Sequence, residues 1–207
     1  MYFVKNPNIV KLFYPSLIWD IKNHEKNIHL TFDDGPGEDI TPEVLNILDK
    51  FNAKATFFCV GEKVVQNPEI FIEITKRGHT IGNHSYNHLK GKQTSSANYI
   101  QNIEKAKAVI DSVLFRPPYG SFNYRQIKKL KNDYKIIMWS VLPGDFDKNV
   151  SKEKVLKRAI QHTKSGSIIV FHDNKKFKDK MIFALTGFLD HFKSQDYNFK
   201  AITDDLF

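Results

Sequence analysis

The sequence contains a single cysteine, Cys59, among 207 residues, so no intrachain disulfide can form. A lone cysteine inside the apolar stretch 55–60 is typical of a small buried side chain rather than a reactive thiol. No run approaches the roughly 18 consecutive apolar residues that a membrane-spanning helix requires, so we expect no transmembrane segment. No Gly-x-Gly-x-x-Gly or P-loop motif follows any apolar run, which argues against a nucleotide-binding site.

The first 19 residues also lack a clear targeting signal. They are mildly apolar but are interrupted by Lys5, Asn6, Pro7, Asn8 and Lys11. The order of basic, then apolar, then small residues that defines a cleavable signal peptide is missing. We therefore take the cytoplasm as the default compartment, and a role in the cell envelope would require another route of export.

Positive charge is in excess, with 31 Lys and Arg against 23 Asp and Glu and a net charge of +8. A basic surface favours anionic partners. The lysines are nevertheless scattered, apart from a cluster at Lys175, Lys176, Lys178 and Lys180. No nucleic-acid-binding motif or stripe of basic and aromatic residues is present. We expect a solvated surface, no nucleic-acid partner and, by default, a monomer.

Short runs rich in Ile, Val, Thr and Phe alternate with amphipathic stretches along the chain. These runs predict seven strands, at 28–32, 55–60, 80–83, 114–116, 136–139, 167–172 and 199–203. Helix starts are indicated by Thr41-Pro42 and Asn67-Pro68, each a capping side chain followed by proline, and by Ser151, which is expected to cap a helix through Thr163. Gly78 and Gly166 stand where helices are expected to stop.

Repeated strand–helix order predicts parallel strands covered by helices, in a barrel or a doubly wound sheet. Polar residues follow five of the predicted strands, and in a barrel the carboxyl ends of all strands surround one mouth. An open sheet would instead concentrate its site at one switch point. The sequence therefore favours an α/β fold, a distorted barrel of about seven parallel strands with outer helices, over residues 28–207. Residues 1–27 are expected to form an N-terminal extension that packs on the barrel.

Two adjacent carboxylates, Asp33 and Asp34, follow the first predicted strand, and two histidines, His84 and His88, follow the third. Two imidazoles and one carboxylate can bind a divalent metal and still leave positions for water and substrate, as catalytic sites do. The other carboxylate then lies close enough to act as a base. Each motif alone has a structural explanation, such as a turn at Asp-Gly-Pro, but together they indicate metal-assisted hydrolysis.

Five motifs occur in a fixed order: Thr-Phe-Asp-Asp-Gly-Pro (31–36), His-Ser-x-x-His (84–88), Arg-Pro-Pro-Tyr-Gly (116–120), Trp139 with Asp145, and Ile-Val-Phe-His-Asp (169–173). In this order, each beside a predicted strand, they resemble the polysaccharide deacetylase family, which is the NodB-homology domain of carbohydrate esterase family four. The resemblance covers residues 28–203, nearly the whole chain. It implies a distorted barrel, a divalent metal and hydrolysis of N-acetyl groups on amino sugars.

The resemblance also implies a role for each matching residue. Asp34, His84 and His88 would bind the metal, usually zinc, although cobalt, nickel or manganese also suit two nitrogens and one carboxylate. Asp33 would act as the general base, held and tuned by Arg116.

On the other side of the site, His172 would be the general acid, tuned by Asp145. The backbone N–H of Tyr119 would help to bind the oxyanion. Pro118, Tyr119 and Trp139 would contact the substrate.

One residue departs from the family pattern. The fourth motif commonly ends Asp-Trp, whereas this chain has Phe146 after Asp145. Phenylalanine keeps an aromatic surface but has no N–H donor. The expected substrate is an N-acetylated glycan, peptidoglycan or chitooligosaccharide. Two alternatives remain open from the sequence: an O-acetyl polysaccharide esterase or small-acyl amide hydrolase, and a carbohydrate-binding module without activity.

Overall fold

The computed structural model describes residues 2–22 and 25–207. Within them, seven strands alternate with helices as expected. The strands are β1 (Asn27–Asp33), β2 (Ala55–Cys59), β3 (Thr80–Asn83), β4 (Leu114–Phe115), β5 (Lys135–Ile136), β6 (Ile168–His172) and β7 (Asn198–Phe199). The helices are α1 (Asn8–Phe13), α2 (Thr41–Lys50), α3 (Gly61–Gln66), α4 (Pro68–Lys76), α5 (Ser96–Lys107), α6 (Tyr124–Leu130), α7 (Lys152–His162) and α8 (Lys178–Lys193).

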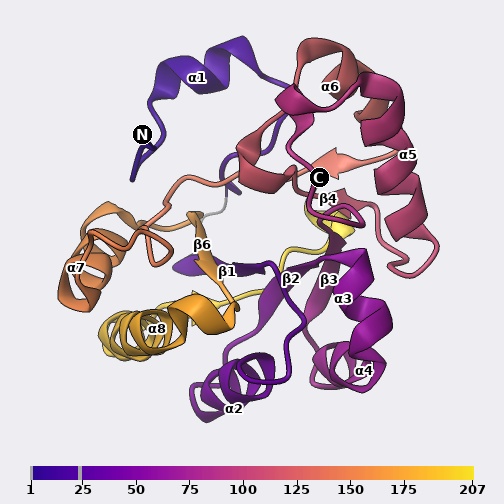
Figure 1. Cartoon of the computed structure of the whole chain (residues 1–207). Coiled ribbons are helices and arrows are strands. Elements are labelled where there is room, and N and C mark those ends of the chain that lie inside the picture. Colours follow the sequence, from indigo (N-terminus) through magenta and orange to yellow (C-terminus); the bar gives the residue numbers. More distant parts are fainter. Residues whose placement is uncertain (1, 23–24) are drawn as a thin grey trace.

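All strand pairs are parallel, in the order β5-β4-β3-β2-β1-β6, with β7 paired to the start of β1. Figure 1 shows the strands curled at the centre with the helices around them. Between β5 and β6 the described residues form only a single parallel bridge, Val141 to Ile169. The prediction of a distorted (β/α) barrel is therefore confirmed, and the irregular stretch after β5 is its distortion.

Two predicted strands are shorter than expected by more than one residue, and each has a physical reason. The run at 136–139 stops at Ile136, since the next two carbonyls, of Ile137 and Met138, accept hydrogen bonds from the buried Arg116 side chain. The run at 199–203 stops at Phe199. The Ile202 N–H donates to the side-chain hydroxyl of Thr56 (2.7 Å) and not to the backbone carbonyl of a neighbouring strand. At the end of each of these two strands, a side chain forms the hydrogen bond that the backbone of a neighbouring strand would otherwise form.

The helix starts were placed correctly, but two of the three proposed caps are wrong. Ser151 caps α7 by accepting the Lys154 N–H at 3.3 Å, and that helix ends at His162, one residue early. Thr41 lies inside α2, and its hydroxyl donates to Asp173 (2.6 Å). Asn67 precedes α4 without capping it, because its amide donates to the Lys63 carbonyl.

The core is rich in phenylalanine. Phe188 of α8 is fully buried, and its ring centroid lies 4.7–6.2 Å from those of Phe171, Phe192 and Phe199. Cys59 is also buried and free, as expected. None of the described helices is long and apolar enough to cross a membrane.

The described part of the N-terminal extension contacts the irregular side of the barrel. The Ile18 N–H donates to the Ile136 carbonyl, and the Met138 N–H donates to the Ile18 carbonyl. Leu17 and Trp19 are buried in the cluster that includes Phe115. Residue 1 and residues 23–24 of the expected extension lie outside the described residues.

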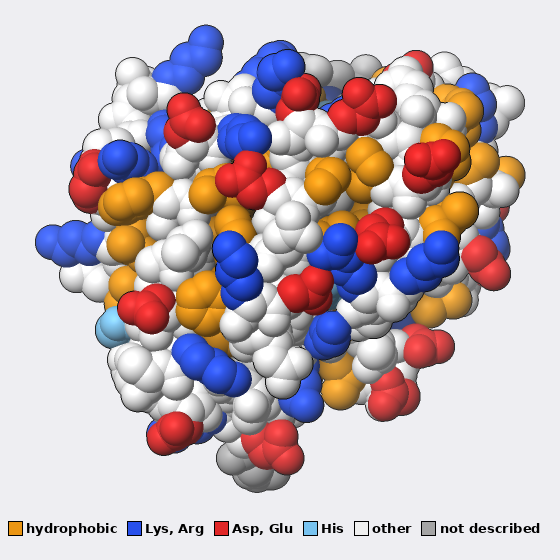
Figure 2. Space-filling view, turned by 90° about the horizontal axis from the view of Figure 1, so that it is seen from below, with side chains coloured by type: hydrophobic (Ala, Val, Ile, Leu, Met, Phe, Trp, Pro, Cys, Tyr) orange, Lys and Arg blue, Asp and Glu red, His pale blue; other side chains and the backbone are white. Residues whose placement is uncertain are grey.

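Charges are mixed on the face shown in Figure 2, where acidic and basic side chains alternate with apolar ones. This face has no broad region of one sign, which agrees with the expectation of a solvated surface.

Replacing Phe188 with alanine should lower the free energy of unfolding by about 3–5 kcal/mol, because the substitution leaves a cavity among three rings. Phe183 of the same helix is 39% exposed. Phe183→Ala should therefore cost less than about 1 kcal/mol. Urea titration of both variants measures the difference, and equal losses would contradict the assigned core.

Candidate active site

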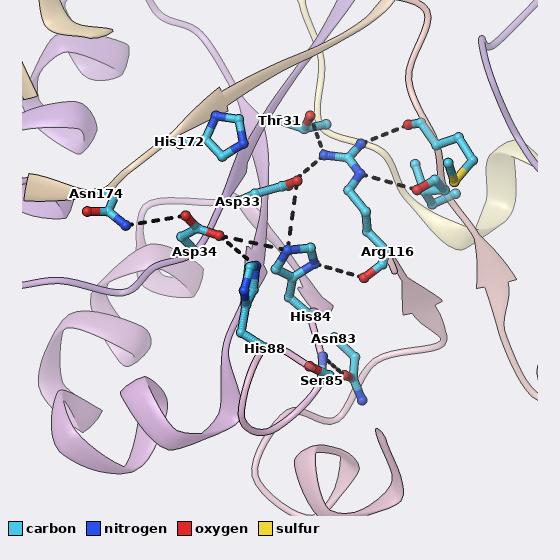
Figure 3. Close-up of polar contacts among 12 residues, drawn as sticks. Thr31, Asp33, Asp34, Asn83, His84, Ser85, His88, Arg116, His172 and Asn174 are labelled. Atoms are coloured by element: carbon cyan, nitrogen blue, oxygen red, sulfur yellow. Dashed lines mark hydrogen bonds and ion pairs between the residues drawn. The ribbon is translucent and has the colours of Figure 1, made fainter. Parts of the chain in front are cut away.

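The predicted site residues meet at the carboxyl ends of the strands. Asp33 is the last residue of β1 and lies in register with His172, the last residue of β6. His84 and His88 follow β3, and Arg116 follows β4. Figure 3 shows these side chains directed toward one another. A cavity of about 550 Å³ opens there, a size typical of a ligand site.

Arg116 is the buried anchor of the site. It has no exposed surface, and its Nη1 donates to Asp33 Oδ1 and to the Thr31 hydroxyl, both at 2.7 Å. Its Nε and Nη2 donate to the carbonyls of Ile137 (3.2 Å) and Met138 (2.9 Å). Burial lowers the pKa of Arg116, and the adjacent Asp33 carboxylate opposes that shift. One carboxylate oxygen of Asp33 is thus fixed, while the other lies 4.0 Å from His84 Nε2.

Asp34, His84 and His88 form a cluster whose potential ligand atoms lie within 4.8 Å of one another. Asp34 Oδ1 is 3.1 Å from His88 Nε2 and 3.9 Å from His84 Nε2. His84 Nδ1 lies 2.8 Å from the Arg116 carbonyl, which can only accept, so Nδ1 carries the proton and Nε2 offers a lone pair. This ring orientation is the one that protein metal sites use.

The protonation states of His84 and Asp34 also favour metal binding by this cluster. Burial lowers the pKa of His84 to about 4, so its imidazole is neutral at pH 7, as a metal ligand must be. Burial alone would raise the pKa of Asp34, but the hydrogen bond with His88 and the charge of His172 hold it well below its usual range. The donor set of two imidazoles and one carboxylate fits a divalent cation.

The loop that carries the two histidines is held by asparagine side chains. Asn83 accepts the Ser85 N–H (2.8 Å), and Asn102 of α5 accepts the N–H groups of Tyr86 and Asn87. Ser85 (φ 62°) and His88 (φ 56°) take the left-handed conformation, which is uncommon outside glycine. These contacts hold the loop where both imidazoles face Asp34.

His172 lies across the cavity from this cluster and is held at two points by Asp145. Asp145 Oδ2 accepts the His172 backbone N–H (2.7 Å), and Oδ1 is 2.9 Å from Nδ1. Burial would lower the pKa of His172, but the charge and hydrogen bond of Asp145 prevail and raise it to about 9. Its Nε2–H is then a proton donor at neutral pH. Phe146 packs edge-on against the imidazole, with centroids 5.0 Å apart.

The three expected substrate residues differ in their placement. Tyr119 (65% exposed) and Trp139 line the cavity, whereas Pro118 is buried and does not. The Tyr119 N–H donates to no acceptor in the described part of the chain, and the residue has φ 59°. Gly120 is required beside it, since a Cβ there would lie 2.7 Å from the Trp139 ring.

Sequence reasoning missed three polar residues that support the site. Asn174 donates to Asp34 Oδ2 (3.3 Å), and Thr31 links Arg116 to the Ile169 carbonyl. Asp173 is buried beside Gly35, where a Cβ would lie 2.1 Å from its carboxylate. Asp173 belongs to the motif 169–173 but had no role assigned, and the only signal for Asn174 was its adjacency to that motif. Thr31 could have been found from the strand alternation, because it shares a face with Asp33.

A carboxylate and an imidazolium on either side of three potential metal ligands form a hydrolytic arrangement, and the fold and site together define a barrel hydrolase. The chain belongs to the polysaccharide deacetylase family, whose model matches residues 20–135.

Individual relatives agree with this assignment. A peptidoglycan-N-acetylglucosamine deacetylase of Bacillus cereus is 35% identical over 195 residues, which cover 91% of this chain and 92% of that protein. A peptidoglycan-N-acetylglucosamine deacetylase of Listeria monocytogenes is 37% identical over 88% of this chain, but this chain covers only 39% of its length. A crystal structure of a peptidoglycan N-acetylglucosamine deacetylase has a TM-score of 0.87 at 28% identity, over 95% of both chains.

Activity should require the protonated form of His172, whose pKa is about 9, and should fall as the pH rises through that value. A cation bound nearby disfavours the protonated imidazole and shifts this fall to a lower pH. Asp145→Asn removes the charge that raises this pKa. The alkaline limb of kcat/KM should then move about 2 units toward the ordinary value of about 6.5. Asp133→Asn, at an exposed position, is the control. An unchanged alkaline limb in Asp145→Asn would contradict the acid role of His172.

Arg116→Lys should keep the positive charge but leave buried carbonyls unpaired. We expect a loss of about 2–4 kcal/mol in the free energy of unfolding, since each unsatisfied buried group costs about 1–3 kcal/mol. As a control, Arg125→Lys at an exposed position of α6 should change the free energy of unfolding by less than about 0.5 kcal/mol. Equal stabilities in urea titration would show that the buried hydrogen bonds are dispensable.

Proposed function

We propose that this chain is a metal-dependent deacetylase that removes N-acetyl groups from N-acetylglucosamine-containing glycans, with peptidoglycan as the first substrate to test. The observation that supports this most directly is the placement of Asp33 and His172 on either side of the Asp34, His84 and His88 cluster. The similarity to peptidoglycan deacetylases supports the substrate class.

Asp34, His84 and His88 would hold the cation, and zinc is the metal that best suits their donors. A divalent metal bound there supplies Lewis-acid polarisation and lowers the pKa of water toward 7. The remaining work falls to the protein's own side chains.

Asp33 accepts a proton from the attacking water as the new C–O bond forms at the acetyl carbon. Arg116 keeps this carboxylate oriented and ionised. The Tyr119 N–H donates to the oxyanion, a type of contact whose loss usually costs about 3–4 kcal/mol of transition-state stabilisation. The Nε2–H of His172 protonates the nitrogen as the C–N bond breaks, and the products are acetate and a free amine.

The test is release of acetate from N-acetylglucosamine oligomers and from peptidoglycan, with zinc added and with a chelator. Asp33→Asn should lower kcat by roughly 10² to 10⁴ while zinc still binds, because only the base is removed. His88→Ala should lower zinc content as well as activity, whereas His162→Ala, outside the site, should change neither.

Activity that persists in chelator, or in His88→Ala without zinc, would refute the metal-dependent mechanism. Faster release from O-acetylated polysaccharide than from either N-acetylated polymer would instead identify an esterase.

A further inference from the structure

A second cavity adjoins the catalytic one and is lined by lysines. This cavity, here named the lysine cavity, has a volume of about 460 Å³. The cationic residues that line it are Lys148, Lys175, Lys176, Lys178 and Lys180. Three residues line both cavities: Phe146, Lys176 and Phe177. A ligand in the catalytic cavity can therefore extend into the lysine cavity without leaving the protein surface.

Part of this positive charge has no counter-ion. Lys175 pairs with Asp39 at 2.8 Å, and Lys178 pairs with Glu43 at 2.8 Å. Lys180 donates to the Asp147 backbone carbonyl, and its charge also acts on the Asp147 carboxylate.

Two exposed lysines of the cavity have no acidic partner among the described residues. Lys148 and Lys176 are exposed, and neither forms an ion pair with any acidic group in the described part of the chain. The cavity has two carboxylates of its own, Asp145 and Asp179. Asp145 is buried and hydrogen-bonded to His172, so it does not neutralise the lysines. The residues that line the lysine cavity therefore carry a net positive charge.

The wall between the two cavities is aromatic. Phe146 and Phe177 both pack edge-on against His172, with ring centroids 5.0 and 6.4 Å away. Because Phe146 and Phe177 contact His172 and also line the lysine cavity, that cavity begins directly beside the proposed proton donor.

We propose that the lysine cavity binds a negatively charged substituent of the glycan, a carboxylate carried by the sugar next to the one that loses its acetyl group. This proposal rests on the proposed function and narrows its substrate to anionic glycans. A chitooligosaccharide offers only neutral hydroxyl and amide groups, which leave Lys148 and Lys176 unpaired. Muramic acid supplies a carboxylate from its lactyl group or, when a peptide is attached, from that peptide.

The test compares kcat/KM for three glycans of equal length: a neutral N-acetylglucosamine oligomer, an N-acetylglucosamine–N-acetylmuramic acid oligomer with free lactyl groups, and the same N-acetylated oligomer with peptides. The anionic substrates should be preferred about tenfold at low salt, and the preference should shrink at high salt because exposed charges are screened. A site for the lactyl carboxylate favours only the second glycan, because attachment of the peptide converts that carboxylate into a neutral amide. A peptide site favours only the third.

Lys148→Gln with Lys176→Gln should abolish the preference, by lowering kcat/KM for the anionic glycans to that for the neutral oligomer. Lys128→Gln with Lys129→Gln removes the same charge from exposed positions in α6 and should keep the preference. Equal kcat/KM for neutral and anionic glycans, or a preference that survives in the first double variant, would overturn the proposal.

Calorimetric binding of the same glycans to zinc-loaded Asp33→Asn separates this proposal from the proposed function. Absence of acetate release from all three glycans by the wild-type protein would refute the function alone. Equal affinity of the variant for neutral and anionic glycans would refute the lysine cavity as an anion site.

Discussion

The ion pair between Arg116 and Asp33 is the interaction on which the site depends. A buried guanidinium is costly unless all its donors are paired, and here they reach a carboxylate, a hydroxyl and two carbonyls. Those carbonyls belong to the irregular chain after β5, so the pairing of Arg116 also determines where that strand ends. Its own carbonyl orients His84. The Arg116 residue thus links the proposed base, a potential metal ligand and the distortion of the barrel.

Backbone strain is concentrated at the same place. Asp34, Ser85, His88 and Tyr119 all have positive φ, while the other two such non-glycine residues in the described chain, Asn52 and Asp196, lie just beyond helices. Conformations of this kind cost about 1–3 kcal/mol each and persist only where the surroundings impose them. Asn83 and Asn174 supply part of that constraint through hydrogen bonds to Ser85 and Asp34. The site is held in an arrangement that its local sequence alone would not adopt.

The strand order along the chain and the clustering of the motifs could be predicted because apolar periodicity and the rule for parallel strands depend on local sequence. The partners of Thr41 and Asn67 could not, since a capping pattern says nothing of a carboxylate 132 residues away. The same holds for Pro118, whose motif placed it near substrate while packing buried it. Whether a lysine is paired, as Lys175 is, or unpaired, as Lys176 is, also depends on distant acidic residues that no motif identifies.

The position of β1 in the sheet has a consequence for the order of folding. This strand pairs with β2 soon after it in the sequence, but its other neighbours, β6 and β7, come from the last 40 or so residues of the chain. Contacts of such long separation form slowly, because the entropy of closing the loop is lost first. During synthesis one edge of β1 therefore stays open until residues 168–199 have left the ribosome. Since Asp33 lies in register with His172, the proposed base and acid come together only in that last step, and a nascent chain that lacks its C-terminal fifth cannot form the candidate site.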